Sequence, residues 1–317
     1  MGSYSKRMRI ISDYQFVEDS DRGATAAIGN FDGVHLGHRS VIELARSAAP
    51  DAPLGIVTFD PHPRTYFAPS APHFRLMSSA ARASRLEKVG VKRLYQLPFN
   101  TALASLTPFN FADKVLHRGL GLKHVVVGAD FCFGKDRAGT AHDLVEFGAQ
   151  LGFGVTIAPL VARSEQTVSS TAIRSALTGA RPRDAAAMLG HWHRIEGPVI
   201  GGEQRGRELG YPTANMSIDG LHPPAFGVYA VLIDVLEGPH TGSYNGVASM
   251  GVRPMFGENK PNLETFIFDF KGDLYGTPLS VGLVEHLRGE EKFDSLEALI
   301  TQMDADSVRA RSILAAL

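Results

Sequence analysis

Apolar positions in the first half of the chain fall into two alternating kinds of pattern. Short continuous apolar runs, such as Leu54 to Phe59 and Val91 to Leu97, predict buried strands. Between the runs, apolar residues recur every three or four positions, as in Gly37 to Ala49, which predicts amphipathic helices. Repeated βα units of this kind predict a parallel sheet with helices on both faces. The same patterns predict strands at Ala24–Phe31, Lys123–Val127 and Phe153–Pro159, and helices at Ser78–Val89, Phe109–Arg118, Ala141–Leu151 and Ser170–Leu177.

The pattern changes after about residue 193. Apolar segments become short and are separated by Gly, Pro, Asn and Asp, which is typical of a small antiparallel barrel or sandwich. Two helices are predicted to follow, with Asp294 and Asp306 as their N-caps. The predicted strands are Gly227–Val235, Tyr244–Met250, Glu264–Phe270 and Leu279–Leu287, and the predicted helices are Asp294–Met303 and Ser307–Leu314.

Charge changes sign close to the same point. The 317 residues carry 32 Lys and Arg against 33 Asp and Glu, a net charge of −1. That total hides a net +6 over residues 1–185 and a net −7 over residues 186–317. The stretch Gly179 to Arg183 contains glycine and proline and predicts a linker, so we expect two domains, 1–185 and 186–317. An overall charge near zero argues against nucleic acid or an anionic membrane as a partner.

The number of cysteines and the lengths of the apolar runs indicate the cellular compartment. Cys132 is the only cysteine, so the chain has no intramolecular disulfide, which is typical of a reducing compartment. No apolar run approaches the roughly 18 residues that a membrane-spanning helix needs. We therefore expect a cytoplasmic protein with no membrane association. A weak homo-oligomer is compatible with the sequence.

The segment from Ile28 to Arg39 joins the first predicted strand to the first predicted helix. Its glycines let the backbone approach a ligand closely, and a helix N-terminus offers unpaired N–H groups suited to phosphate. His35 and His38 can donate to a phosphate whose charge grows during transfer. A zinc site is disfavoured because it commonly needs three or four ligands and no cysteine partner is present. The residues predicted to bind ATP phosphates here are Gly29, Asn30, Phe31, Asp32 and Gly33.

Two further segments follow strands of the same predicted sheet. Asp60 and His62 come after the second strand, and Asp130 and Phe131 come after the fourth. Because the carboxyl ends of parallel strands meet at one edge of a sheet, we expect these side chains near the histidines.

The last helix of this half also opens on polar residues. The hydroxyls of Ser169, Ser170 and Thr171 and the guanidinium of Arg174 are suited to holding a polyphosphate leaving group. Taken alone, an ordinary N-cap is the simpler explanation of these hydroxyls.

These motifs carry a family resemblance. The string His35-x-Gly37-His38 with Ser169-Ser170-Thr171-x-Ile173-Arg174 resembles the nucleotidyltransferase superfamily, whose fold is Rossmann-like. The strings Gly29–His35 and Phe59–Pro63 are similar to the FMN adenylyltransferase module of bacterial bifunctional FAD synthetases. The resemblance implies ATP and FMN as substrates and FAD and pyrophosphate as products. It implies catalytic roles for His35, His38 and Arg174, and flavin contacts at Asp60, His62, Asp130 and Phe131.

A second glycine-rich segment, Gly201 to Gly210, precedes Tyr211-Pro212-Thr213-Ala214-Asn215. Backbone N–H groups of such a loop can hold phosphates. Thr213 and Asn215 supply hard oxygen donors at i and i+2, which suits Mg²⁺ bound to ATP. A turn-rich connection without chemistry fits the spacing equally well. The phosphate-binding residues predicted in the loop are Gly206, Arg207 and Gly210.

Pro212–Asn215 resembles the riboflavin kinase signature, and further marks of that family follow in order, among them Gly227–Tyr229 and Asp273–Gly276. The resemblance implies an antiparallel barrel in which Glu264 is the base that accepts the proton of the ribityl 5′-hydroxyl. From the residues alone, Glu264 is equally well a surface carboxylate on a strand. Two departures from the family, Met255 and Phe226, are expected to affect flavin affinity more than activity.

Together the resemblances extend from about Thr25 to Leu314 and imply a bifunctional riboflavin kinase and FMN adenylyltransferase. The expected ligands are riboflavin, FMN, FAD, ATP and Mg²⁺. Three other interpretations stay open: one module is inactive; the chain is a flavin or nucleotide sensor that binds without turnover; or it is an RNA-binding protein related to synthetases. The −7 charge of the second half disfavours the last.

Overall fold

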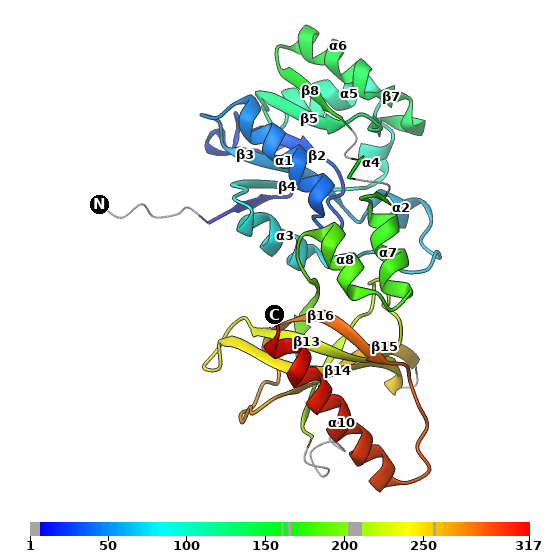
Figure 1. The fold of residues 1–317 in the computed structure, drawn as a ribbon. Helices are drawn as coiled ribbons and strands as arrows, with labels where there is room; N and C mark the ends of the chain where they lie inside the picture. Colours follow the sequence, from blue (N-terminus) through cyan, green and yellow to red (C-terminus); the bar gives the residue numbers. More distant parts are fainter. Residues whose placement is uncertain (1–6, 160–161, 164–165, 202–210, 256–257) are drawn as a thin grey trace, which may run out of the picture. The chain divides into compact units, whose positions relative to one another are not determined.

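The computed structural model describes residues 7–159, 162–163, 166–201, 211–255 and 258–317. Contacts divide the chain into two compact units (Figure 1). The first unit comprises residues 1–71 and 82–168, and the second comprises residues 72–81 and 169–317. Contacts therefore group the helices that follow Ser169 with the second unit. The boundary expected after residue 185 stays a prediction.

The first unit is built on a six-stranded sheet whose strands are all parallel, in the order β1-β4-β3-β2-β5-β8. The strand order reverses direction between β2 and β5, which makes their carboxyl ends the point where ligands bind in such sheets. The short edge strand β1 was missed by the sequence patterns because it has three residues and is largely exposed. The strands are β1 Arg9–Ile11, β2 Thr25–Ile28, β3 Leu54–Asp60, β4 Arg93–Pro98, β5 His124–Gly128 and β8 Gly154–Ala158.

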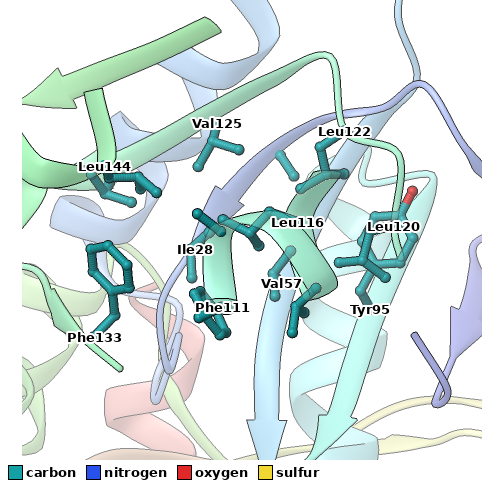
Figure 2. Close-up of a cluster of buried hydrophobic side chains, with 14 of the residues drawn as sticks. Ile28, Val57, Tyr95, Phe111, Leu116, Leu120, Leu122, Val125, Phe133 and Leu144 are labelled. Atoms are coloured by element: carbon teal, nitrogen blue, oxygen red, sulfur yellow. The ribbon is translucent and has the colours of Figure 1, made fainter. Parts of the chain in front are cut away.

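The helices predicted at 37–49, 78–89 and 141–151 are confirmed, whereas the short helices Pro63–Phe67 and Thr101–Ala104 were not predicted. The expected helix at 109–118 is instead a short α5 that continues as a π-helix over Phe111–His117. Its buried side chains, among them Phe111 and Leu116, lie in one cluster with the strand residues Ile28 and Val57 (Figure 2). The helices are α1 Leu36–Ala48, α2 Pro63–Phe67, α3 Ser79–Lys88, α4 Thr101–Ala104, α5 Pro108–Asn110 and α6 Ala141–Leu151. Two small hairpins pair β6 Cys132–Phe133 with β7 Gly139–Thr140, and β9 Ala162–Arg163 with β10 Gln166–Thr167.

The second unit begins with a helical pair, α7 Ser170–Thr178 and α8 Pro182–Leu189. Ile173 and Leu177 of α7 pack against Ala185 and Leu189 of α8. The stretch 179–183, expected to be a linker, is therefore a turn between two packed helices that runs into the start of α8. Its glycine and proline end one helix and start the next.

The rest of the second unit is an antiparallel six-stranded sheet in the order β11-β16-β13-β14-β15-β12. The amide of Ile200, just beyond β11, donates to the carbonyl of Asn215 in β12 at 2.8 Å, which links the two edge strands. The sheet thus curls toward a barrel, and the expected α/β plus antiparallel-barrel fold class is confirmed. The strands are β11 His193–Pro198, β12 Thr213–Ser217, β13 Gly227–Val235, β14 Gly242–Met255, β15 Glu258–Ile267 and β16 Pro278–Arg288.

Strand β13 shows how this sheet is buried on both faces. Tyr229, Val231 and Ile233 point into the barrel core, whereas Ala230 between them packs toward the C-terminal helix. That helix, α10 Leu296–Ala315, lies along the outer face of the sheet (Figure 1). Successive side chains of the strand therefore pack alternately into the barrel core and toward the C-terminal helix.

The two predicted terminal helices form one. Ser295, not Asp294, is the N-cap of α10, and its hydroxyl accepts from the amide of Ala298 at 3.1 Å. Asp306, predicted to cap a second helix, is buried inside α10 and forms an ion pair with Arg288. A buried carboxylate paired with a half-buried guanidinium needs no free helix end, which explains the wrong prediction.

Among the described residues, no helix is long and apolar enough to cross a membrane.

Candidate active sites

Three predicted segments lie at one edge of the parallel sheet. Strand β2 leads to Gly29, β3 ends at Asp60 and β5 leads to Asp130. These strands are adjacent and parallel, so their carboxyl ends share an edge. This edge is also where the strand order reverses.

The loop after β2 is held in an unusual backbone conformation. Phe31 and Val34 have φ angles of 50° and 44°, which residues other than glycine seldom adopt. Both side chains are buried, so their packing in the apolar interior fixes the loop. The hydroxyl of Thr58 and the guanidinium of the buried Arg82 also donate to the carbonyl of Asn30, at 3.3 and 3.1 Å. Such over-determined strain is typical of a ligand-binding loop.

The two histidines form a stacked pair at the start of α1. Their ring centroids are 3.6 Å apart and their planes differ by 18°. His35 is the N-cap, and its Nδ1 accepts from the backbone amide of His38 at 3.2 Å. A neutral imidazole that accepts at Nδ1 carries its proton on Nε2, so His35 presents a donor there. Gly37 permits this arrangement, because a Cβ at that position would lie 3.1 Å from the His35 ring.

Both rings are neutral near pH 7. Burial lowers the pKa of His35 to about 4. Burial, and secondarily the proximity of His35, lowers the pKa of His38 well below its ordinary value. Among the described residues the buried Nδ1 of His38 has no hydrogen-bond partner. The pair is thus suited to donate hydrogen bonds to an anion without carrying charge beforehand.

Residues after β3 combine a carboxylate, an imidazole and aromatic rings. Asp60 accepts from the side-chain amide of Gln96 at 3.2 Å. His62 caps α2 through Nδ1, which accepts from the amide of Arg64. Phe67, at the end of α2, is 69% exposed and makes edge contacts with Tyr66 and Phe99. Sequence reasoning missed Phe67, although an aromatic residue at the end of a short helix that closely follows a strand end is the available signal.

After β5 the predicted residues are arranged differently. Asp130 is exposed, and the ring of Phe131 is half-buried and stacks on Phe133 with centroids 5.4 Å apart. Cys132 lies between them, partly exposed, and its thiol donates weakly to the Asp130 carbonyl at 3.7 Å.

Ser169, Ser170, Thr171 and Arg174 belong to the second unit and are described within it. Ser169 is the N-cap of α7, accepting from the amide of Ala172 at 3.2 Å. Arg174 donates to Thr171 Oγ1 at 3.4 Å and to the carbonyl of Phe74 at 3.3 Å. The simpler explanation, an N-cap, is thus realised by Ser169, whose hydroxyl proton remains available to a phosphate.

The barrel contains a cavity of about 530 Å³. Thr213 and Asn215 line it, as does Thr265, which is fully buried and whose hydroxyl has no hydrogen-bond partner among the described residues. The oxygen donors of Thr213 and Asn215 fit Mg²⁺, which binds few protein groups and keeps waters and phosphate oxygens as its other ligands. The other lining residues are Val199, Pro212, Ala214, Ile267, Phe270, Lys271, Gly272, Asp273, Leu274 and Tyr275.

Glu264 lies directly across from Asn215 in the pairing of β12 with β15. It is half-buried and is not one of the described residues that line the cavity. A third side chain, Asn262, donates to both: its Nδ2 is 3.4 Å from Asn215 Oδ1 and 3.3 Å from Glu264 Oε1. Sequence reasoning missed Asn262, because only strand register reveals its neighbours.

Some predicted residues lie outside the described part of the chain. Gly206, Arg207 and Gly210 fall in the undescribed segment 202–210, and the side chain of Met255 is not described. Phe226 packs partly buried against the barrel core. Within the described residues there is no group of three or more His, Cys, Asp or Glu arranged to hold a metal ion.

A parallel sheet with a strained loop and paired histidines at its switch point, joined to a barrel with oxygen donors beside a carboxylate, is characteristic of a two-module, nucleotide-dependent transferase. Comparisons with known proteins identify the family. Residues 17–172 match the FAD synthetase family model and residues 189–314 match the riboflavin kinase family model. The chain belongs to the bifunctional riboflavin kinase/FMN adenylyltransferase family.

Similar proteins support this assignment over the full length. The bifunctional riboflavin kinase/FMN adenylyltransferase of Pseudomonas fluorescens is 40% identical over 311 residues, covering 97% of this chain and 98% of that protein. That of Bacillus subtilis (strain 168) is 32% identical, covering 96% and 97%. A crystal structure described as a macrolide-efflux protein from Streptococcus pneumoniae superimposes with a TM-score of 0.81 at 31% identity, covering 96% of this chain and 98% of that one.

Proposed function

We propose that the chain converts riboflavin and ATP to FMN and ADP in the barrel, and FMN and a second ATP to FAD and pyrophosphate at the parallel sheet. Membership of the bifunctional family, with both family models matched in order, carries the proposal. The expected site residues occur in both units, which argues against a chain with one inactive module.

In the kinase reaction, Glu264 accepts the proton of the ribityl 5′-hydroxyl as its oxygen attacks the γ-phosphorus of ATP. The bond between the γ-phosphorus and the bridging oxygen breaks, and ADP leaves. Thr213 and Asn215 would hold Mg²⁺, which neutralises charge on the phosphates when bound. Gly206, Arg207 and Gly210 remain the predicted phosphate contacts of the loop.

In the adenylyl transfer, a phosphate oxygen of FMN attacks the α-phosphorus of ATP, and the bond to the β,γ-pyrophosphate breaks. The neutral, stacked His35 and His38 donate to the phosphate as its charge grows, and the loop Gly29–Gly33 supports it from its backbone. We assign Arg174 and the hydroxyls of Ser169, Ser170 and Thr171 to the pyrophosphate. No covalent enzyme intermediate is needed.

The flavin of the second reaction is assigned to the strand ends after β3 and β5. Asp60, His62, Asp130 and Phe131 are the predicted contacts, and the exposed ring of Phe67 adds an aromatic surface beside the first two. A cytoplasmic location, the absence of nucleic-acid partners and a weak homo-oligomer remain predictions.

The test is a chromatographic product assay on the full chain. Incubated with riboflavin, ATP and Mg²⁺, the protein should form FMN first and then FAD, with ADP and pyrophosphate as co-products. Tight flavin binding with neither FMN nor FAD formed would favour a sensor and overturn the proposal.

A further inference from the structure

Three polar side chains share one face of the β12–β15 pair. Asn215 is the cross-strand neighbour of Glu264, and Asn262 precedes Glu264 by two residues, so all three point to the same side. Asn262 is only 3% exposed. A buried amide is costly unless it is hydrogen-bonded, and the NH₂ group of Asn262 faces Glu264 Oε1 and Asn215 Oδ1.

The chemistry of the partners fixes the orientation of these groups. An ionised carboxylate only accepts hydrogen bonds, so the nitrogen of Asn262 must face Glu264. The second hydrogen of the same NH₂ is then available to Asn215, which turns its oxygen, rather than its nitrogen, toward Asn262. The nitrogen of Asn215 is directed to the carbonyl of Thr213, at 3.5 Å. One buried amide thus sets the orientation of two side chains.

We propose that Asn262 is a positioning residue of the kinase reaction, which holds the Glu264 carboxylate and the Asn215 side-chain oxygen in fixed relative positions. The inference rests on the proposed function, because it takes Glu264 as the proton acceptor and Asn215 as a Mg²⁺ ligand. Asn262 itself contacts neither substrate nor metal in this role. Misplacing a reacting group by about 1 Å can cost as much as a hundredfold in rate, so the effect should be large.

Three substitutions of Asn262 separate positioning from packing. Asn262→Leu has similar volume without donors, Asn262→Ser keeps one donor, and Asn262→Asp places a second carboxylate against Glu264. We expect kcat for FMN formation to fall about tenfold in Asn262→Leu, less in Asn262→Ser and about a hundredfold in Asn262→Asp. The KM for riboflavin should stay within about twofold, because the amide does not contact the flavin.

A binding measurement without turnover addresses the second contact. Mg²⁺ is titrated calorimetrically into the full chain saturated with ADP, and Asn215→Ala defines the part of the signal that comes from the barrel. That part should weaken severalfold in Asn262→Leu and less in Asn262→Ser, whose single O–H can donate to only one of the two partners. Unchanged Mg²⁺ binding would mean that Asn262 does not position Asn215.

Two controls separate the outcomes. Asn245→Asp makes the same exchange at an exposed position of β14 and should leave FMN formation unchanged. Circular dichroism and a thermal melt report folding of each variant, and FAD formation from supplied FMN reports that the other site is intact. Wild-type kcat and Mg²⁺ binding in Asn262→Leu or, should that variant not fold, wild-type kcat in Asn262→Asp would overturn the inference alone. A wild-type chain that makes no FMN would overturn the proposed function itself.

Discussion

The two candidate sites are assembled in different ways. At the parallel sheet, each contributing segment is a contiguous string that follows a strand, and strand order brings the strings to one edge. In the barrel, the candidate residues Asn215, Asn262 and Glu264 sit on two strands and meet only through register and hydrogen bonds. A site built from strand ends can be recognised in the sequence as contiguous motifs. A site built on a sheet face can be recognised only once the pairing of the strands is known.

The sharpest way to separate the sites is to remove the proton acceptor from one of them. Glu264→Gln keeps the shape of the side chain but removes its basicity, so FMN formation should fall about a thousandfold. FAD formation from supplied FMN should be unchanged, because Glu264 belongs to the barrel. Both rates are measured chromatographically on the same preparation. Parallel loss of both activities in a folded variant would show that the chemistry is shared.

The histidine site should also make the stability of the chain depend on pH. Burial lowers the pKa of His35 to about 4, against an ordinary value near 6.5. Between these values the unfolded chain binds the proton that the folded chain excludes, so stability falls as pH falls from 6.5 to 4. The shift corresponds to about 3 kcal/mol of unfolding free energy.

Urea unfolding of the wild type and of His35→Gln at pH 7 and pH 4 measures this contribution. The loss of unfolding free energy on acidification should be smaller in His35→Gln by about that amount. An equal loss in both proteins would mean that the His35 ring is not held neutral.

A smaller change tests the close contact that positions His35. In Gly37→Ala the new methyl group would lie 3.1 Å from the His35 ring, so the ring must shift by a few tenths of an ångström. We expect FAD formation to fall about tenfold while FMN formation is retained. Ser47→Ala, at an exposed position of the same helix, is the control. Full activity of Gly37→Ala would show that the stacked geometry is not required.

The smallest predicted effect distinguishes a cap from a phosphate ligand. Ser169 and Ser295 are both N-caps with a hydroxyl accepting from the third following amide, at 3.2 and 3.1 Å. Replacing either with Ala should cost about 1 kcal/mol of stability. Only Ser169→Ala should also raise the KM for ATP in FAD formation severalfold. Identical kinetics in the two variants would reduce Ser169 to a cap.

Sequence patterns located the repeated βα order, the barrel and the segments at the strand ends. They were reliable there because buried strands and amphipathic helices leave strong periodicities, and because the strands β2, β3 and β5 each end in a polar string. The family resemblance supplied the roles of these residues.

What the sequence did not predict depends on contacts between distant residues. Asp306 is of a residue type that is favoured at helix N-caps. Its partner Arg288, however, lies on another element and holds it inside a continuous helix. Asn262 has no local signature, because its neighbours are set by the pairing of β15 with β12. The π-helix at Phe111–His117 arises in the packed core, where tertiary contacts override the helical period.

We assign to this one chain two separate active sites that work in succession. The most direct test is the product profile of His38→Asn given riboflavin, ATP and Mg²⁺. We predict that FMN accumulates at the wild-type rate while FAD formation falls about a hundredfold or more. FAD made at the wild-type rate, or loss of FMN together with FAD in a folded protein, would contradict the account.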